Sequence, residues 1–229
     1  MTNKRILVAA LAAGLLTYGG LVGGEAVITG GLSGQAADEA VVTGTTVHLD
    51  RSGRPTAVGE VRNQFGEPIT NVTVTVSFYR DGELVDERSR QALRGTVPAG
   101  ESAPFDIRLD SEGEVDRVET SVAFDRGGAV LDGLVVTDKE VAHESQDQVD
   151  VTATITNRAD RALILSSAIA TFYDDRRAVI GARTERPTRR IEPGESYTVR
   201  ISFRTLGDVP SYARDFERFD VSVVAERAE

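Results

Sequence analysis

The sequence predicts an all-β protein made of two tandem immunoglobulin-like antiparallel β-sandwiches behind an N-terminal hydrophobic helix. Three observations support this fold class. From residue 41 onward, apolar and polar residues alternate with a period of two, which is typical of half-buried strands. Short apolar runs are separated by Gly, Pro and Asp turn signals at spacings of roughly 8–12 residues. The chain also repeats itself at a shift of 94 positions, with no insertion between residues 42 and 107.

The internal repeat decides the domain organisation. The matching pairs are Val47 and Val141, Asn63 and Asn157, Phe78 and Phe172, Asp81 and Asp175, and Gly100 and Gly194. We therefore expect one sandwich over residues 41–125, a hinge over residues 126–133 and a second sandwich over residues 134–229. Domains of this size bury about 60% or more of the surface that the unfolded chain exposes, which is enough for a core.

The N-terminal segment, residues 1–24, carries the strongest localisation signal. No charge interrupts the 19 residues from Ile6 to Gly24, and Lys4 and Arg5 precede them. A helix of that length spans roughly 28 Å, close to the hydrocarbon core of about 30 Å. The positive flank predicts that the remaining chain lies outside the cytoplasmic membrane. A retained single-pass membrane anchor is the favoured interpretation; a secretion signal cleaved near Ala36 and a buried core helix are the alternatives.

Residues 25–40 predict a flexible Gly/Ala/Ser spacer, and the strands begin after it. In the first copy the best-defined strand is 72–79, where Val72, Val74, Val76 and Phe78 share the inner face. The other expected strands of this copy are 47–49, 57–62, 83–88, 104–109 and 118–124. Turns are expected at 65–68, 80–82 and 98–100, where Gly and Pro cluster.

The second copy repeats this plan. Its expected strands are 134–141, 149–156, 168–173, 178–182, 197–203 and 219–225. It is about seven residues longer between its last two strands, over Thr205–Arg218. No amphipathic helical stripe of useful length follows residue 40, so both copies are expected to consist of strands and turns.

Two short motifs resemble a known family. Residues 170–174 are ATFYD and residues 191–196 are IEPGES, so that an aromatic-Tyr-Asp turn precedes Pro-Gly-Glu-Ser. This combination resembles the FxLYD family, a β-sandwich module of extracytoplasmic bacterial and archaeal proteins. The first copy departs from the pattern, because Arg80 stands where the family has Asp and Pro98-Ala99-Gly100 replaces Pro-Gly. Neither copy has Phe at the first motif position or Leu at the third. The resemblance covers most of both copies and implies fold and location, without a common activity.

The composition excludes several classes of function. The chain has 36 acidic and 26 basic residues, a net charge of −10 and no cysteine. Disulfides, thiolate metal sites and Cys nucleophiles are therefore excluded, and nucleic acid is not an expected partner. Only Lys4 and Lys139 are lysines. Abundant acid with almost no Lys resembles proteins of salt-loving archaea, in which surface charge maintains solubility at high salt; a GC-rich genome that favours Arg and Ala codons is the alternative.

One stretch of the second copy concentrates positive charge. Its six arginines are Arg176, Arg177, Arg183, Arg186, Arg189 and Arg190. They are candidates for contact with an anionic partner, such as lipid headgroups or an acidic glycan. The alternative is that charged residues along an edge strand discourage edge-to-edge pairing. The longer loop 205–218 carries Tyr212 and Phe216, and it is either a recognition loop or a plug that closes the sandwich.

Other candidate sites are weaker. Asn71 begins an Asn-Val-Thr sequon on the outward face of its strand, so it is a candidate for glycosylation. Tyr79 and Tyr173 also have outward parity, and we expect them to pack under a loop or to cap a sheet edge. The acidic run 110–116 only superficially resembles a calcium loop, because it lacks the EF-hand spacing.

No motif predicts catalysis. The two histidines occupy unrelated repeat positions, and neither a nucleophile motif nor a phosphate loop is present in the sequence. We expect no metal and no cofactor. The sequence favours a non-catalytic cell-envelope protein that contacts an envelope protein or a surface polymer. The alternative is an extracytoplasmic solute-binding accessory protein with its site between the two sandwiches, near residues 125–132.

Overall fold

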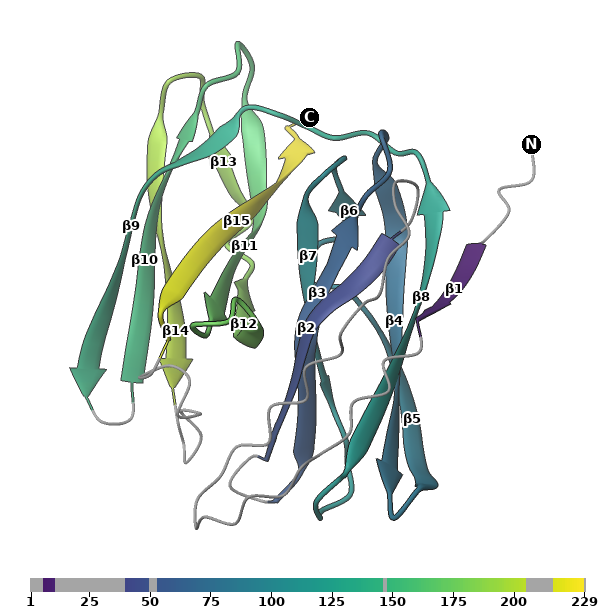
Figure 1. Cartoon of the computed structure of the whole chain (residues 1–229). Helices are drawn as coiled ribbons and strands as arrows, with labels where there is room; N and C mark the ends of the chain where they lie inside the picture. The colour runs from purple at the N-terminus through teal and green to yellow at the C-terminus, as the bar shows by residue number, and fades with distance from the viewer. Residues whose placement is uncertain (1–5, 11–39, 50–52, 146–147, 205–215, 229) are drawn as a thin grey trace. The chain divides into compact units, whose positions relative to one another are not determined.

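The computed structural model describes residues 6–10, 40–49, 53–145, 148–204 and 216–228. The described part of the chain consists of strands in antiparallel sheets and contains no helix (Figure 1), which confirms the predicted all-β class. The chain divides into two compact units. The first comprises residues 1–129 together with residues 176–180, and the second comprises residues 130–175 together with residues 181–229.

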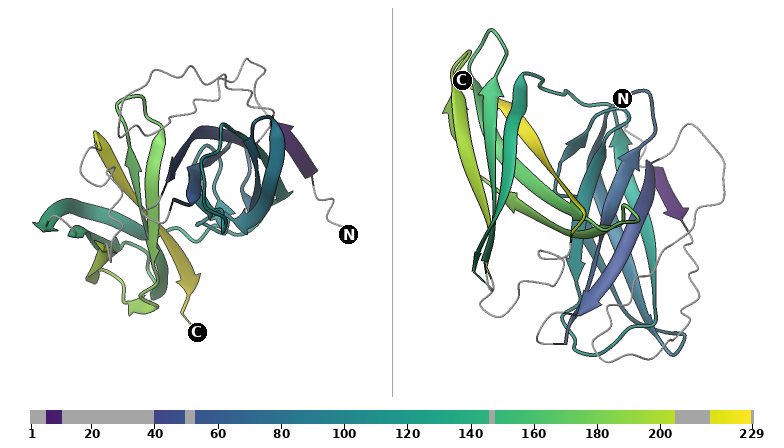
Figure 2. Two further views of the ribbon diagram at one scale, coloured as in Figure 1. Left: turned by 90° about the horizontal axis from the view of Figure 1, so that it is seen from below. Right: turned by 60° about the vertical axis from the view of Figure 1, so that its left-hand side comes forward.

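The first unit contains two antiparallel sheets, seen end-on in Figure 2 (left). One sheet is ordered β1 (Ile6–Ala10), β8 (Arg117–Arg126), β4 (Ile69–Arg80) and β5 (Glu83–Gln91), and β6 (Thr96–Val97) also pairs with β4. The other sheet is ordered β2 (Ala40–Leu49), β3 (Pro55–Asn63) and β7 (Ser102–Arg108).

Both sheets contribute to one core. The alternation predicted for the central strand is observed, because Val72, Val74, Val76 and Phe78 are each at most 1% exposed. Residues of the opposite sheet complete the cluster, including fully buried Phe105 on β7. The ring of Phe105 requires glycine at the paired position of β3, since a Cβ on Gly59 would lie 2.7 Å from Phe105 Cζ. The period-two pattern therefore produces a two-sheet, sandwich-like core.

The predicted N-terminal helix is only partly covered by the described residues. Within Ile6–Ala10 the structure has a strand in place of the expected helix. This strand pairs with β8, placing Ile6 opposite Phe124 and Val8 opposite Val122. Residues 11–24 of the predicted helix lie outside the described part of the chain. Within the residues that the structure describes, no helix has the length and apolar character needed to cross a membrane.

The second unit repeats the plan of the first. One sheet is ordered β9 (Leu134–Ser145), β10 (Gln148–Asn157) and β14 (Ser196–Arg204). In the other sheet, β11 (Leu163–Tyr173) pairs with β12 (Val179–Glu185), β13 (Arg189–Ile191) and β15 (Arg218–Arg227). Fully buried Ile155, Leu165, Phe172 and Ile201 come from both sheets.

Strand β11 begins at Leu163, five residues before the predicted start at residue 168. The pairing of β11 with β15 shifts register between Leu165 and Ser167. The hydroxyl of Ser166 donates a hydrogen bond of 3.1 Å to the main-chain carbonyl of Val224. A bulge interrupts the alternation of apolar and polar residues at this point, which is why the sequence pattern concealed the first part of the strand.

Candidate functional site

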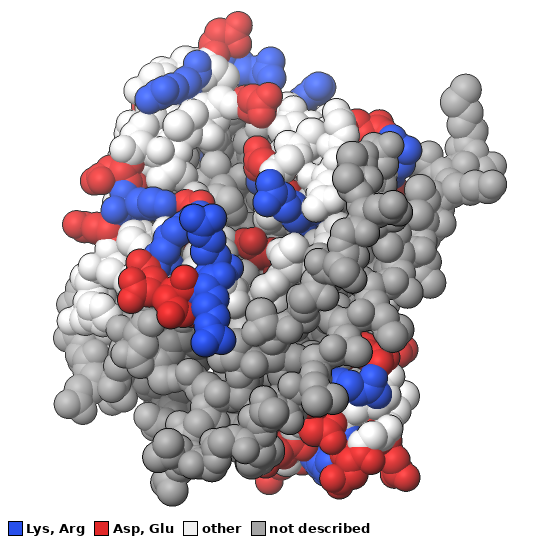
Figure 3. Space-filling model, viewed as in Figure 1, with Lys and Arg blue, Asp and Glu red and all other residues white. Residues whose placement is uncertain are grey.

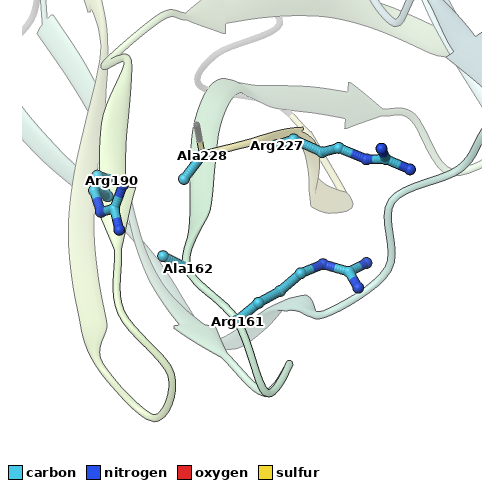
Figure 4. Close-up of a pocket in the computed structure, with 5 residues that line it drawn as sticks. All are labelled: Arg161, Ala162, Arg190, Arg227 and Ala228. Atoms are coloured by element: carbon cyan, nitrogen blue, oxygen red, sulfur yellow. The ribbon is translucent and has the colours of Figure 1, made fainter.

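A pocket of about 480 Å³ lies at one end of the second unit. It is lined by Arg161, Ala162, Arg190, Arg227 and Ala228 (Figure 4). The three arginines come from three elements: the turn between β10 and β11, strand β13 and strand β15. In the close-up, the side chains of Arg161 and Arg227 extend in the same direction, and Arg190 stands on the other side of the two alanines.

Strand pairing explains why these residues meet. Leu163, near the start of β11, pairs with Ile191 of β13 on one side and with Arg227 of β15 on the other. The next residue, Ile164, pairs with Arg190. The ends of β13 and β15 therefore flank the beginning of β11, and Arg161 lies two residues before that strand begins.

A buried asparagine fixes the turn that carries Arg161. The Nδ2 of Asn157 donates to the carbonyls of Arg161 (2.8 Å) and Ile191 (2.9 Å). Its Oδ1 accepts a 2.9 Å hydrogen bond from the main-chain N–H of Ala159. The side chain of Asn157 is fully buried, and its bonds hold the turn against the end of β13.

The pocket is electropositive. No acidic residue is among those that line it. Within the described residues, no ion pair to Arg161 or Arg227 is observed. Arg190 Nε lies 2.8 Å from Glu192 Oε1, but both side chains are more than half exposed, so this pair is weak and easily exchanged. The site therefore offers guanidinium donors to an anion and no group suited to proton transfer, because arginine stays protonated in proteins.

The arginine cluster predicted from the sequence does not gather at one place. Of the six residues, only Arg190 lines the pocket. Arg189 lies 5.4 Å from the centre of the Tyr197 ring and 3.9 Å from Glu195, and Arg183 lies 5.9 Å from the centre of the Phe203 ring. The remaining three are exposed: Arg176, Arg177 and Arg186. Sequence reasoning found one of the three pocket arginines and missed Arg161 and Arg227, which are isolated along the chain.

Of the two loop aromatics, Tyr212 lies outside the described residues. Phe216 belongs to an aromatic cluster of the second unit, with ring centres 4.8 Å from Phe172 and 5.9 Å from Phe219. The ring of His143 stacks on Phe216 at 6.4 Å. Phe216 therefore has the packing expected of the plug alternative.

The outward tyrosines of the two copies share one arrangement. Tyr79 pairs with Arg117 across the sheet, and the guanidinium lies 3.8 Å above its ring. In the second unit, Tyr173 and Arg218 repeat this contact at 4.9 Å. The Tyr79 hydroxyl also donates a 2.8 Å hydrogen bond to Glu119, and this bond raises the pKa of Tyr79. Both tyrosines are held by cation–π contacts on the sheet surface.

The acidic run 110–116 is organised by an arginine. The guanidinium of Arg80 donates to the carbonyls of Glu114 (2.8 Å) and Glu112 (3.4 Å). The carboxylate of Asp116 accepts a 2.7 Å hydrogen bond from the main-chain N–H of Asp81. Arg80 stands where the second copy has Asp174, and its guanidinium holds the loop. Among the described residues, no group of three His, Asp or Glu side chains is placed to hold a metal ion.

The glycosylation candidate lies at the surface. Asn71 is exposed and has a positive φ of 52°, at a register shift between β4 and β8. Its Nδ2 donates a 2.9 Å hydrogen bond to Asp125. Glycosylation at Asn71 stays a prediction. Over the face shown in Figure 3, basic and acidic side chains are interspersed, so positive charge is not a general property of this surface.

Comparison with known proteins gives no assignment. No protein-family model matches the chain, and no curated protein matches it. Among solved structures, it is similar to a red sea bream transglutaminase, with 13% identity, a TM-score of 0.23 and coverage of 82% of this chain and 32% of the other. A β-glucuronidase from glycoside hydrolase family 2 has 12% identity and a TM-score of 0.25, and the match covers 68% of this chain and 21% of the other. A calcium-binding mutant of Bacteroides uniformis β-glucuronidase 2 has 10% identity and a TM-score of 0.24, and the match covers 88% of this chain and 28% of the other. The chain spans about a third or less of each of these proteins.

Proposed function

We propose that this chain is a non-catalytic cell-envelope protein, in which two immunoglobulin-like, FxLYD-like sandwiches stand outside the cytoplasmic membrane and act by contact with a partner. The observation that carries the proposal is the pocket of the second unit, which is lined by Arg161, Arg190 and Arg227. The partner, an envelope protein or a surface polymer, presents an anionic group to this pocket.

The charge of the whole chain makes such a pocket selective. A chain with a net charge of −10 repels anionic partners in general, so attraction is confined to a local positive site. A partner must then place its anion at that site, which gives orientation as well as attraction. The pocket is lined by arginine and alanine alone, and this lining suits binding, since it has no nucleophile or general base.

The proposal is tested by capture from the native envelope. The tagged full-length chain is cross-linked in its own cells at native salt, recovered from the membrane fraction and compared with the Arg161→Glu/Arg227→Glu variant. A matched control, Arg62→Glu/Arg90→Glu, makes the same charge change at two exposed arginines of the first unit. We expect loss of the captured partner in the pocket variant alone. Equal recovery from the pocket variant and the control would refute the proposal.

The membrane anchor is a separate part of the proposal and has its own test. It requires residues 6–10, which pair with β8 in this structure, to leave the sheet and join the apolar segment. We expect the native protein to keep residues 1–24, so that its intact mass corresponds to the whole chain. A native chain that begins near residue 37 would replace the anchor with a cleaved secretion signal, while leaving the role of the pocket unchanged.

A further inference from the structure

The two copies can be compared residue by residue at the pocket. The shift of 94 positions places Glu67 of the first copy at Arg161 of the second. The last strands, RVETSVAFDR at 117–126 and RFDVSVVAER at 218–227, place Arg126 at Arg227. In the first unit, Glu67 Oε1 and Arg126 Nη2 form an ion pair at 2.5 Å. The second unit therefore has an arginine where the first unit has the carboxylate partner.

The backbone frame around this position is the same in both units. Nδ2 of Asn63 donates to the carbonyl of Glu67 at 2.9 Å, as Asn157 does to that of Arg161 at 2.8 Å. Asn63 also donates to Val97, and Asn157 donates to Ile191, its counterpart. Because the frame is preserved, the change at this site is a change of side chains alone.

The two copies differ at three positions of this frame, and a fourth position, Arg126 and Arg227, is the same in both. Glu67 becomes Arg161, Thr96 becomes Arg190, and Arg126 remains as Arg227. The third substitution removes a ring: Phe65, which lies 4.8 Å under the Arg126 guanidinium, is replaced by Ala159. One cation paired with one anion in the first unit thus corresponds to three cations around the pocket in the second, of which Arg190 is paired with Glu192.

We propose that this pocket binds a phosphate-type oxyanion carried as a phosphate ester. The inference rests on the proposed function, since it names the anion that the partner presents. Each guanidinium is a planar fork of donors that pairs with two oxygens at once. The forks of Arg161 and Arg227, which extend in the same direction, together offer more donors than a two-oxygen carboxylate can accept and suit the several oxygens of a phosphate group, while Arg190 adds positive charge from the other side of the two alanines (Figure 4). The volume of about 480 Å³ equals that of roughly 16 water molecules. It therefore exceeds a lone anion and leaves room for the group that carries the phosphate, beside Ala162 and Ala228.

Titration calorimetry on the full-length chain in detergent tests this chemistry. The probes are glycerol 3-phosphate as a soluble phosphate ester, dihexanoyl phosphatidylglycerol below its micelle concentration as a lipid headgroup, and acetate as a carboxylate. We expect one of the phosphate esters to bind at least ten times more tightly than acetate. Preference for glycerol 3-phosphate identifies a soluble or glycan-borne phosphate, and preference for phosphatidylglycerol identifies a lipid headgroup. Equal binding of acetate and both phosphate esters would overturn the proposal.

The matched variant is supplied by the other copy. Arg161→Glu rebuilds the Glu67–Arg126 pair in the second unit, so we expect it to fold normally and to lose at least tenfold in phosphate-ester affinity. Arg227→Gln removes one charge while retaining a donor and is expected to lose affinity as well; Arg62→Glu is the control that should not. Unchanged affinity in both pocket variants would overturn the proposal. If Arg161→Glu/Arg227→Glu loses the captured envelope partner but wild-type protein binds no phosphate ester, the interaction role stands and the phosphate assignment falls.

Discussion

The buried asparagine of each copy gives a sharp stability prediction. Asn63 is fully buried, and its Nδ2 donates to the carbonyls of Glu67, Val97 and Pro98 at 2.9, 2.9 and 3.0 Å. Its Oδ1 accepts a 2.9 Å hydrogen bond from the main-chain N–H of Phe65. The two N–H groups of Nδ2 are shared among these three carbonyls, so alanine removes two donors and one acceptor and leaves main-chain groups without partners. At about 1 kcal/mol for each lost bond, we expect Asn63→Ala to lower the free energy of unfolding of the first unit by about 3 kcal/mol.

The counterpart in the second unit provides the comparison. The side chain of Asn157 donates two hydrogen bonds and accepts one, so Asn157→Ala is expected to destabilise its own unit by about 3 kcal/mol. Hydrogen exchange followed by mass spectrometry distinguishes the units, because each variant should speed exchange only in the copy that carries it. Domains have about 5–15 kcal/mol of stability, so both variants should still fold. A decrease in the free energy of unfolding below about 0.5 kcal/mol at either position, as for ordinary surface substitutions, would refute the stabilising role of the asparagine hydrogen bonds.

Three further predictions concern single side chains. Burial alone would raise the pKa of Asp150, but hydrogen bonds from Arg200, Ser202 and Gln148 outweigh it and hold the pKa low. Its stabilisation is therefore complete above about pH 4 and is lost as the pH falls further, and Arg200→Ala should reduce this loss in acid unfolding curves. Glu119→Gln should lower the raised pKa of Tyr79, seen by ultraviolet difference titration, because it removes a negative charge at the hydroxyl. Phe172→Ala, which empties a fully buried site, should cost about 3–5 kcal/mol in denaturant unfolding.

The sequence was sufficient for the fold where a strand alternates without interruption. Strand β4 was recognisable because four alternate side chains between Val72 and Phe78 face the core without a break in the pattern. The first residues of β11 were missed because a bulge at Ser166 and Ser167 breaks the period. Strands β6 and β13 have two and three residues, too few for any period to show. Periodicity therefore finds long regular strands and misses bulges and short pairings.

The pocket was harder to predict, because its arginines are far apart in the sequence. Arg161 corresponds to Glu67 at an offset of 94 residues, whereas Arg227 corresponds to Arg126 at an offset of 101. The longer connection before β15 causes this change, so a single offset aligns one partner of the ion pair and misaligns the other. The cluster at 176–190 was conspicuous because its residues are adjacent, yet only Arg190 reaches the pocket. Density of charge along the chain was therefore a poor guide to density in space.

The small contribution of the Glu67–Arg126 ion pair explains why the two copies can differ at the position of Glu67 and Arg161. The side chains of Glu67 and Arg126 are 45% and 48% exposed, and exposed pairs contribute about 0–1 kcal/mol. Exchanging Glu67 for an arginine thus costs the fold little, whereas exchanging the buried asparagine would cost several times more. The exposed side chains at the positions of Glu67 and Arg161 can therefore differ between the copies, whereas the buried asparagines that bind the main chain beside them cannot. A duplicated domain acquires a new binding site most readily at such a place, where the backbone is fixed and the charge is not.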